Sequence, residues 1–388
     1  MSRMRWPLHP SPVVGEALSS WISRVANEYA QTPEQLLADD LGYPGLHDEH
    51  IDLMPPRELL CQLRVRAGLS IKTIDLMTLA GHVPTLLDDL NGSAESFNNY
   101  CHRYSVLLPP GRRSARLLPG WRPWWSVAER WPVARACREC IEQAGFCFYR
   151  LAWRLPILSC CPVHGLMLER AVLGRPDYCH WPETNPMIAA PALQAMDRRT
   201  WAALTRGTVE LPGRAISAAA WLRLLRTVVD ELSARSGLQG DGSAIKEAWN
   251  RAGVPYRAGL EKWECYEALP HERQTWLMQG AAEAIQAIET RNICTGGLEA
   301  CYFRQYPLAL KLAVDNGDDS PEWRRIRNIY WGIDHRIAWA RIRPEEAPGL
   351  RTLLLWGRFD AESVAYVDGT MRRLGFDVRL AKSKRWGV

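Results

Sequence analysis

Four residues in the middle of the chain have the types and spacing of a metal-binding set. They are Cys137, Cys140, Cys161 and His164, arranged as a Cys-x2-Cys pair, twenty residues, and a Cys-x2-His pair. Two such pairs separated by about 15 to 20 residues are typical of a structural zinc site. Three thiolates and one imidazole would complete the coordination of one Zn²⁺ and leave no position for water. We therefore expect a metal with a structural function and no part in catalysis. Cys160 competes with Cys161, but only Cys161 has the x2 spacing to His164.

The rest of the sequence favours metal binding over disulfides for these cysteines. The chain of 388 residues contains 11 cysteines. It has no apolar run of about 18 residues that could span a membrane, and its first residues lack the apolar stretch of a signal peptide. We therefore expect a cytoplasmic protein without a membrane contact. Thiols stay reduced in that compartment, which makes paired cysteines better candidates for metal ligands.

Positive charge is concentrated around this motif. Residues 101–175 hold 12 arginines against 4 acidic residues, whereas the net charge of the whole chain is only +5. Guanidinium groups suit phosphate oxygens, and affinity for nucleic acid follows the number of phosphates neutralised. A general preference for Arg over Lys along the chain is the alternative explanation. The candidate nucleic-acid contacts in this segment are Arg112, Arg113, Arg116 and Arg122.

Helices are predicted before the motif. Apolar residues at helical spacing predict a helix from Gly15 to about Tyr29, and Thr32 followed by Pro33 predicts the start of a second helix. Residues 56–81 indicate a helix, a turn at Gly68 and a second helix capped by Ser70, which is the order of elements in a helix-turn-helix. Its reading face would carry Lys72 and Thr73. That face is poorly basic, so a plain helical hairpin fits equally well.

The predicted fold class is mainly α, in several domains. Residues 105–132 are rich in Pro, Trp and Arg and are expected to form an extended connector. A Pro- and Ala-rich stretch at 185–195 precedes further helices, predicted at about 215–234, 274–290 and 361–374. We expect an N-terminal helical domain over 1–100 with the helix-turn-helix-like unit, a zinc-finger, ribbon-like module over 101–185, and a C-terminal helical domain over 186–388.

Two segments resemble the TniQ family of transposition proteins. The run PSPVVGEALSSWISRVA, with Glu16, Ser20, Trp21 and Arg24, is similar to the family's opening signature. CREC and YRLAWRLPILSCCPVHGLML resemble its zinc module, with an aromatic-rich strand ending in Trp153 and Leu155. Together they cover about the first 170 residues. Two features depart from the family pattern: only Cys179 and His180 follow where many members have a second cysteine pair, which makes a second zinc doubtful, and Arg138 replaces the usual Pro of the first knuckle.

The resemblance implies a function in choosing the target site for transposition. It implies as partners an AAA+ ATPase, a DDE transposase reached indirectly through that ATPase, target DNA, possible association with a guide-RNA effector complex, and a second copy of the chain. In this role the protein is a non-catalytic adaptor.

Enzymatic alternatives fit the residues poorly. A zinc deaminase needs His-x-Glu ahead of Pro-Cys-x-x-Cys, but His47-Asp48-Glu49 lies far upstream and Ala136 precedes the cysteine pair. The chain contains no Gly-Lys dipeptide, which a phosphate-binding loop requires. The strand-rich core of a transposase is not visible. A zinc-containing DNA-binding transcription regulator remains the alternative function, because it too would bind nucleic acid.

Overall fold

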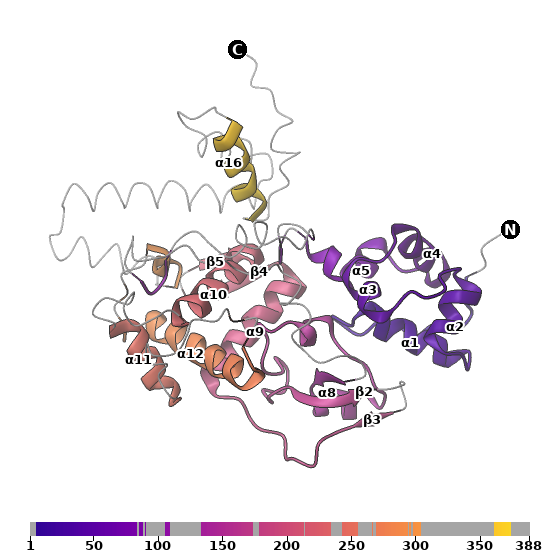
Figure 1. The fold of residues 1–388 in the computed structure, drawn as a ribbon, viewed down its shortest axis with the longest axis horizontal. Helices are drawn as coiled ribbons and strands as arrows, with labels where there is room; N and C mark the ends of the chain where they lie inside the picture. The colour runs from indigo at the N-terminus through magenta and orange to yellow at the C-terminus, as the bar shows by residue number, and fades with distance from the viewer. Residues whose placement is uncertain are drawn as a thin grey trace.

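The secondary structure of this chain is mainly helical, as predicted (Figure 1). The computed structural model describes residues 5–83, 85–87, 90, 105–108, 133–173, 178–212, 214–233, 243–254, 266, 269–293, 295, 298–303 and 361–373. None of the helices in these ranges is long and apolar enough to cross a membrane. The few strands in the described part of the chain are short and belong to two small antiparallel sheets.

Short helices form the N-terminal part, drawn in indigo in Figure 1. They are α1 (Leu18–Glu28), α2 (Pro33–Gln35), the π-helical turn η1 (Leu36–Asp40), α3 (Asp48–Leu53), α4 (Arg57–Ala67), α5 (Ile71–Asp75) and the 3-10 turn η2 (Leu79–His82). The predicted stripe of α1 is buried, with Trp21 and Ile22 fully inaccessible. Thr32 and Gln35 form a capping box at α2, so the predicted start of the second helix is confirmed.

The pair α4–α5 has the predicted turn at Gly68 and the predicted helix cap at Ser70. Gly68 ends α4 with a positive φ of 68°, which suits a residue without a side chain, and the Ser70 hydroxyl accepts from the Thr73 amide at 3.0 Å. The second helix has only five residues, or about 7.5 Å of length at 1.5 Å per residue. Lys72 and Thr73 are exposed on it. That this pair reads DNA stays a prediction.

The middle of the chain combines a three-stranded sheet with short helices. Its elements are β1 (Val133–Ala136), α8 (Arg138–Ala144), the 3-10 turn η3 (Leu151–Arg154), β2 (Glu169–Leu173) and β3 (Cys179–His180). The strand order is β1-β2-β3, with both pairs antiparallel. The prediction of a strand that ends in Trp153 and Leu155 is wrong. Trp153 lies in η3 and Leu155 directly after it, and both are buried. Leu151, Ala152 and Trp153 are buried in succession, which a tight turn allows, whereas the side chains of a strand alternate between its two faces.

The rest of the described chain is mainly helical. It consists of α9 (Pro191–Arg206), the hairpin strands β4 (Thr208–Leu211) and β5 (Arg214–Ser217), α10 (Ala218–Leu232), α11 (Ser243–Ala252), α12 (His271–Glu289), the 3-10 turn η6 (Leu298–Phe303) and α16 (Ala361–Arg373). The three predicted helices are confirmed as α10, α12 and α16. The stretch 185–195 was expected to precede the helices, but α9 begins inside it, with Pro191 at the first helical position. The β4–β5 hairpin was not predicted.

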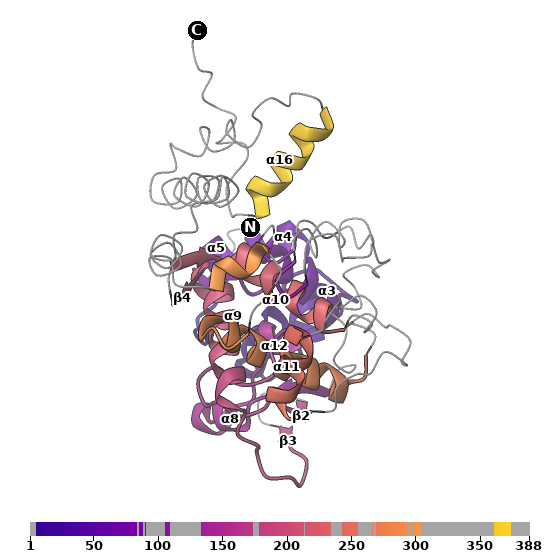
Figure 2. The ribbon, with the colours of Figure 1, turned by 90° about the vertical axis from the view of Figure 1, so that its left-hand side faces the viewer.

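Two hydrophobic cores organise these elements. One core is formed by residues between Trp6 and Met77, in the N-terminal helices alone. The other runs from the middle segment into α9, α10 and α12, which pack against one another. Figure 2 gives the perpendicular view, in which α9, α10, α11 and α12 lie close together above α8 and β2. Apolar packing therefore continues across residue 185, where we expected a domain boundary.

Candidate metal centre

Two local structures bring the four predicted ligands together. Cys137 is the N-cap of α8 and Cys140 lies in its first turn, so one pair is presented by a helix start. The other pair lies in a tight turn in which the Gly165 amide donates to the Cys161 carbonyl at 2.8 Å. Gly165 has a φ of 69°, which a residue with a side chain rarely adopts. A helix start therefore brings the first pair together, and a turn brings the second pair together.

The spacing of the four ligand atoms fits a tetrahedral metal ion. Metal–sulfur bonds of about 2.3 Å and metal–nitrogen bonds of about 2.05 Å place ligand atoms roughly 3.5 to 3.8 Å apart. The Sγ atoms of Cys140 and Cys161 are 3.6 Å apart, and His164 Nδ1 lies 3.4, 3.4 and 3.7 Å from the sulfurs of Cys137, Cys140 and Cys161. All four atoms lie within 4.8 Å of one another, so this cluster could bind one metal ion.

The histidine is oriented as a metal ligand. Its Nδ1 faces the three sulfurs, while Nε2 lies 3.2 Å from Oε1 of Gln143 on α8. A metal-bound imidazole usually donates its other N–H to such an acceptor, which fixes the tautomer and the ring plane. The pattern Cys-x2-Cys-x2-Gln contains this partner, but nothing in the sequence alone singles it out.

The three thiols titrate as a group. Hydrogen bonds from the Cys137 and Cys140 thiols lower the pKa of Cys161 to about 2, and its sulfur also accepts from the backbone amides of His164 and Val163. Hydrogen bonding to Cys140 and Cys161 raises the pKa of Cys137 far above its usual range. A negative charge shared by three sulfurs is the electrostatic environment that a divalent cation neutralises.

A buried carboxylate holds the backbone that leads into the second pair. Oδ2 of Asp197, on α9, accepts from the amides of Ser159 at 2.8 Å and Cys160 at 2.6 Å. Burial raises the pKa of Asp197 to about 7 in spite of these bonds. Cys160 therefore lies beside Asp197, and Cys161 is the cysteine that joins the cluster. No sequence signal points to Asp197, because it is distant in the chain from Cys161 and matches no motif.

A second metal site gains no support. Among the described residues, the cluster above is the one group of three or more potential ligands close enough to share an ion. Cys179 hydrogen-bonds with Cys147, which raises its pKa well above the usual range. His180 joins neither thiol in such a group.

Residues 7–168 match the TniQ family model. The chain carries a TniQ domain. This match spans both resembling segments and all four residues of the metal cluster, and TniQ proteins belong to DNA transposition, so the protein is transposition-associated. No curated protein and no solved structure matches the chain.

The signature residues of the TniQ domain fasten its helices to the metal module. Glu16 is buried and pairs with Arg24 at 2.7 Å, while the Ser20 hydroxyl donates to Glu16 at 3.0 Å. Burial raises the pKa of Glu16, and the Arg24 charge opposes that rise. The Arg24 guanidinium lies 4.2 Å from the centre of the Phe146 ring, and the Tyr149 amide donates to Ser20. Phe146 and Tyr149 follow α8, so these residues join α1 to the metal module.

A second network makes the same connection. Asp52 of α3 is fully buried and accepts from the Ser19 amide and hydroxyl, from the Tyr149 hydroxyl at 2.8 Å and from Arg154 at 2.9 Å. The Ser19 and Tyr149 hydroxyls also contact each other. Sequence reasoning missed this network because its members lie on three separate elements.

Of the predicted nucleic-acid residues, the structure describes Lys72 and Thr73, and neither belongs to the metal cluster. Arg112, Arg113, Arg116 and Arg122 lie outside the described residues. Lys72 and Thr73 are exposed at the start of α5, where Thr73 contributes to the lining of a pocket. Their role in binding nucleic acid stays a prediction.

Proposed function

We propose that this protein is a non-catalytic adaptor in target-site selection for DNA transposition. It would link target DNA, or a complex that recognises the target, to an AAA+ ATPase and through it to a DDE transposase. The observation that carries the proposal is the TniQ match across residues 7–168, which includes the Cys137, Cys140, Cys161 and His164 cluster. We assign Zn²⁺ to that cluster, because three sulfurs and one imidazole nitrogen at tetrahedral spacing suit it.

A closed ligand set supports the adaptor role. Four protein ligands leave no coordination position for water or substrate, so the metal has a structural function. The two networks around Glu16 and Asp52 extend that function, since they fix the N-terminal helices on the metal module. A rigid surface built from several short elements suits a protein that must hold its binding partners in a fixed relative position.

Association with the ATPase of the same mobile element tests the proposal. The purified full chain, ATP and the purified ATPase would be analysed by size exclusion with light scattering, with and without a target duplex. We expect a complex with the ATPase and no ATP hydrolysis by the chain alone. Cys161→Ser should lose both zinc and the complex, whereas Cys61→Ser, at an exposed cysteine of α4 outside the cluster, should keep both.

The opposite results identify the alternative function. Tight binding to one duplex sequence by the chain alone, with no complex with the ATPase, would indicate a transcription regulator. The same experiment measures self-association, so it also tests the expected homodimer. Replacing the duplex by a guide-RNA effector complex tests the other expected route to the target.

A further inference from the structure

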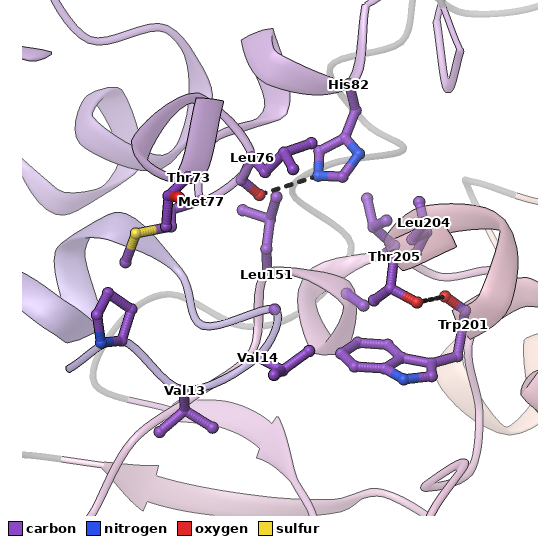
Figure 3. A pocket seen from close by; sticks show the side chains of 14 residues that line it. Val13, Val14, Thr73, Leu76, Met77, His82, Leu151, Trp201, Leu204 and Thr205 are labelled. Carbon is purple, nitrogen blue, oxygen red and sulfur yellow. Dashed lines mark hydrogen bonds between the residues drawn. The ribbon is translucent and has the colours of Figure 1, made fainter. Parts of the chain in front are cut away.

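A pocket of about 250 Å³ lies where the TniQ domain meets α9 (Figure 3). Its walls come from the segment before α1, from α5 and η2, from η3, and from the C-terminal half of α9. The lining residues are Pro12, Val13, Val14, Gly15, Thr73, Leu76, Met77, His82, Leu151, Ala152, Leu155, Trp201, Leu204 and Thr205. It therefore exists only when the N-terminal helices, the metal module and α9 are assembled.

The lining of this pocket is apolar and uncharged. Its one ionisable side chain among the described residues is His82, whose Nε2 lies 3.1 Å from the Leu76 carbonyl oxygen. Burial lowers the pKa of His82, so the ring is neutral near pH 7. The Thr205 hydroxyl donates to the Trp201 carbonyl at 2.8 Å. Few polar groups remain to read a nucleotide base or to bind an anion, and an apolar group is the best complement.

Apolar surface continues outside the pocket. Val14 is 67% exposed and Leu76 is 36% exposed, and Figure 3 places them on opposite walls. Ligand pockets for small molecules usually measure about 300 to 1,000 Å³, so this one is small for a cofactor and suits a single large side chain. An apolar rim around such a pocket is typical of a protein interface, where one anchor residue is buried and its neighbours pack around it.

Exposed basic residues adjoin the pocket lining in the chain. Lys72 and Arg206 are next in the chain to the two lining threonines, are exposed, and form no ion pair with a described residue. Arg150 lies 4.9 Å from the centre of the Trp201 ring. Asp75 is an acid without an ion pair to a described residue there, and Glu16 is neutralised by Arg24. The balance of free charge is positive, which complements an acidic partner.

We propose that this pocket receives an apolar side chain from an acidic segment of the ATPase. The proposal rests on the adaptor function proposed above, and adds the chemistry of the contact. The anchor would pack among Met77, Leu151 and Leu204, and acidic neighbours would face Lys72 and Arg206. Because three parts of the chain build the pocket, the partner would bind there only when the TniQ domain is packed against α9.

The test uses the full chain, the purified ATPase and titration by biolayer interferometry at several salt concentrations. Val14→Asp removes apolar rim and adds repulsive charge, and we expect at least tenfold weaker binding. Lys72→Glu/Arg206→Glu should weaken binding several-fold and reduce its salt dependence. Met54→Asp, at a residue 64% exposed outside the pocket, and Lys246→Glu/Arg372→Glu are the matched controls and should stay within about twofold of wild type. Zinc content and melting temperature confirm that each variant is folded.

The outcomes separate the two proposals. If the wild-type chain does not bind the ATPase, the adaptor function fails and the pocket assignment fails with it. If wild type binds and the pocket variants bind equally well, the pocket assignment alone is overturned. If the variants instead lose DNA binding or self-association while ATPase binding persists, the pocket takes nucleic acid or a second copy, and the assignment to the ATPase is again overturned.

Discussion

In the described part of the chain, three buried carboxylates hold backbone that is distant from them in sequence. Asp52 accepts from the Ser19 amide, Asp197 from two amides before Cys161, and Glu231 from the amides of Val106 and Leu107. A buried carboxylate is costly unless donors surround it, and a backbone amide is a donor that no substitution removes except proline. At each place the carboxylate and its donors lie at least 33 residues apart in sequence. These residues therefore fasten one element to another.

Removing one metal ligand should remove the metal. The wild-type chain should carry about one zinc, and Cys137→Ser should carry almost none, because three remaining ligands bind far more weakly than a closed set of four. Inductively coupled plasma mass spectrometry of purified protein measures this. Cys147→Ser removes a thiol outside the cluster and should leave the stoichiometry unchanged. Full zinc in Cys137→Ser would show that the cluster is not the site.

Asp197 should make stability fall with rising pH. Burial raises the pKa of Asp197 to about 7 in the folded chain from its ordinary value of 3.8, so between these values the folded state holds a proton that the unfolded state lacks. Stability is then lost as pH rises, by up to about 1.4 kcal/mol per pH unit, and levels off above pH 7. We expect the melting temperature of wild type relative to Asp197→Asn to drop between pH 5.5 and 7. If the melting temperatures of wild type and Asp197→Asn change in parallel with pH, the raised pKa of Asp197 is contradicted.

The ligand set could be predicted from sequence, whereas its supports could not. Cys137, Cys140, Cys161 and His164 are short-range pairs, and local spacing is visible in one sequence. Asp197 and Asp52 act across long sequence separations, and an isolated acidic residue has the same appearance whether it is buried or exposed. Glu16, Ser20 and Arg24 were noted as a signature, but their function as a buried network required the structure.

Helical elements were predicted better than the strands. The stripes of α1 and α10 follow the period of a helix, and Thr32, Gly68 and Ser70 mark ends by local hydrogen bonding. The β4–β5 hairpin has only four residues in each strand, too few to establish an alternating pattern. The Pro- and Ala-rich stretch is expected to precede the helices, whereas α9 begins inside it, because Pro is favoured at the first position of a helix.

The contact between the segment before α1 and α9 depends on one glycine. Gly15 has a φ of 72°, and a Cβ there would lie 2.3 Å from Cη2 of Trp201. Gly15→Ala should therefore destabilise the chain by more than the roughly 1 to 2 kcal/mol of a strained backbone, since the ring must also move. Thermal unfolding measures the loss.

Gly207→Ala is the matched control for that substitution. Gly207 has a similar φ of 77° with no atom within 4 Å of the added Cβ, so it reports backbone strain without the clash. In a Trp201→Ala background, Gly15→Ala should cost no more than Gly207→Ala. An equal loss for both glycines in the wild-type background would mean that Trp201 is not held against Gly15.

At the scale of the whole molecule, contacts cross the sequence-based boundaries at residues 100 and 185. Trp201 of α9 packs on the N-terminal segment, Asp197 holds the metal module, and Glu231 of α10 holds Val106 and Leu107. Composition and punctuation can suggest linkers, but they contain no information on which surfaces meet. The division into three domains is therefore still a prediction about independent folding.

Truncation tests that prediction. A fragment of residues 1–185 loses Asp197, Trp201 and Glu231 together, so its amides at 159 and 160 lose their acceptor and apolar surface of the metal module is uncovered. We expect a lower melting temperature and faster proteolysis than for a fragment of residues 1–303, which keeps α9 to α12. Equal stability of the two fragments would show that the first 185 residues fold by themselves.

At the scale of the whole molecule, the uneven distribution of charge along the chain should determine how it binds DNA. Residues 101–175 carry 12 arginines and 4 acidic residues, so this part should supply most phosphate contacts if the chain binds DNA directly. Reversing Arg112, Arg113 and Arg116 to Glu should weaken duplex binding and lower the slope of log K against log salt by up to about 0.9 for each lost contact, or roughly three units in total. Fluorescence anisotropy with a labelled duplex, at salt concentrations from about 50 to about 200 mM, gives that slope.

Reversal of Lys246, Arg251 and Arg372 changes the net charge equally at sites elsewhere in the chain, and should lower the slope far less. Zinc content should be unchanged in both variants, because none of these residues belongs to the ligand set. An unaltered slope in the first variant would mean that this segment does not contact phosphate, and the exposed residues of α4 and α5, including Lys72 and Thr73, would then be the next surface to test.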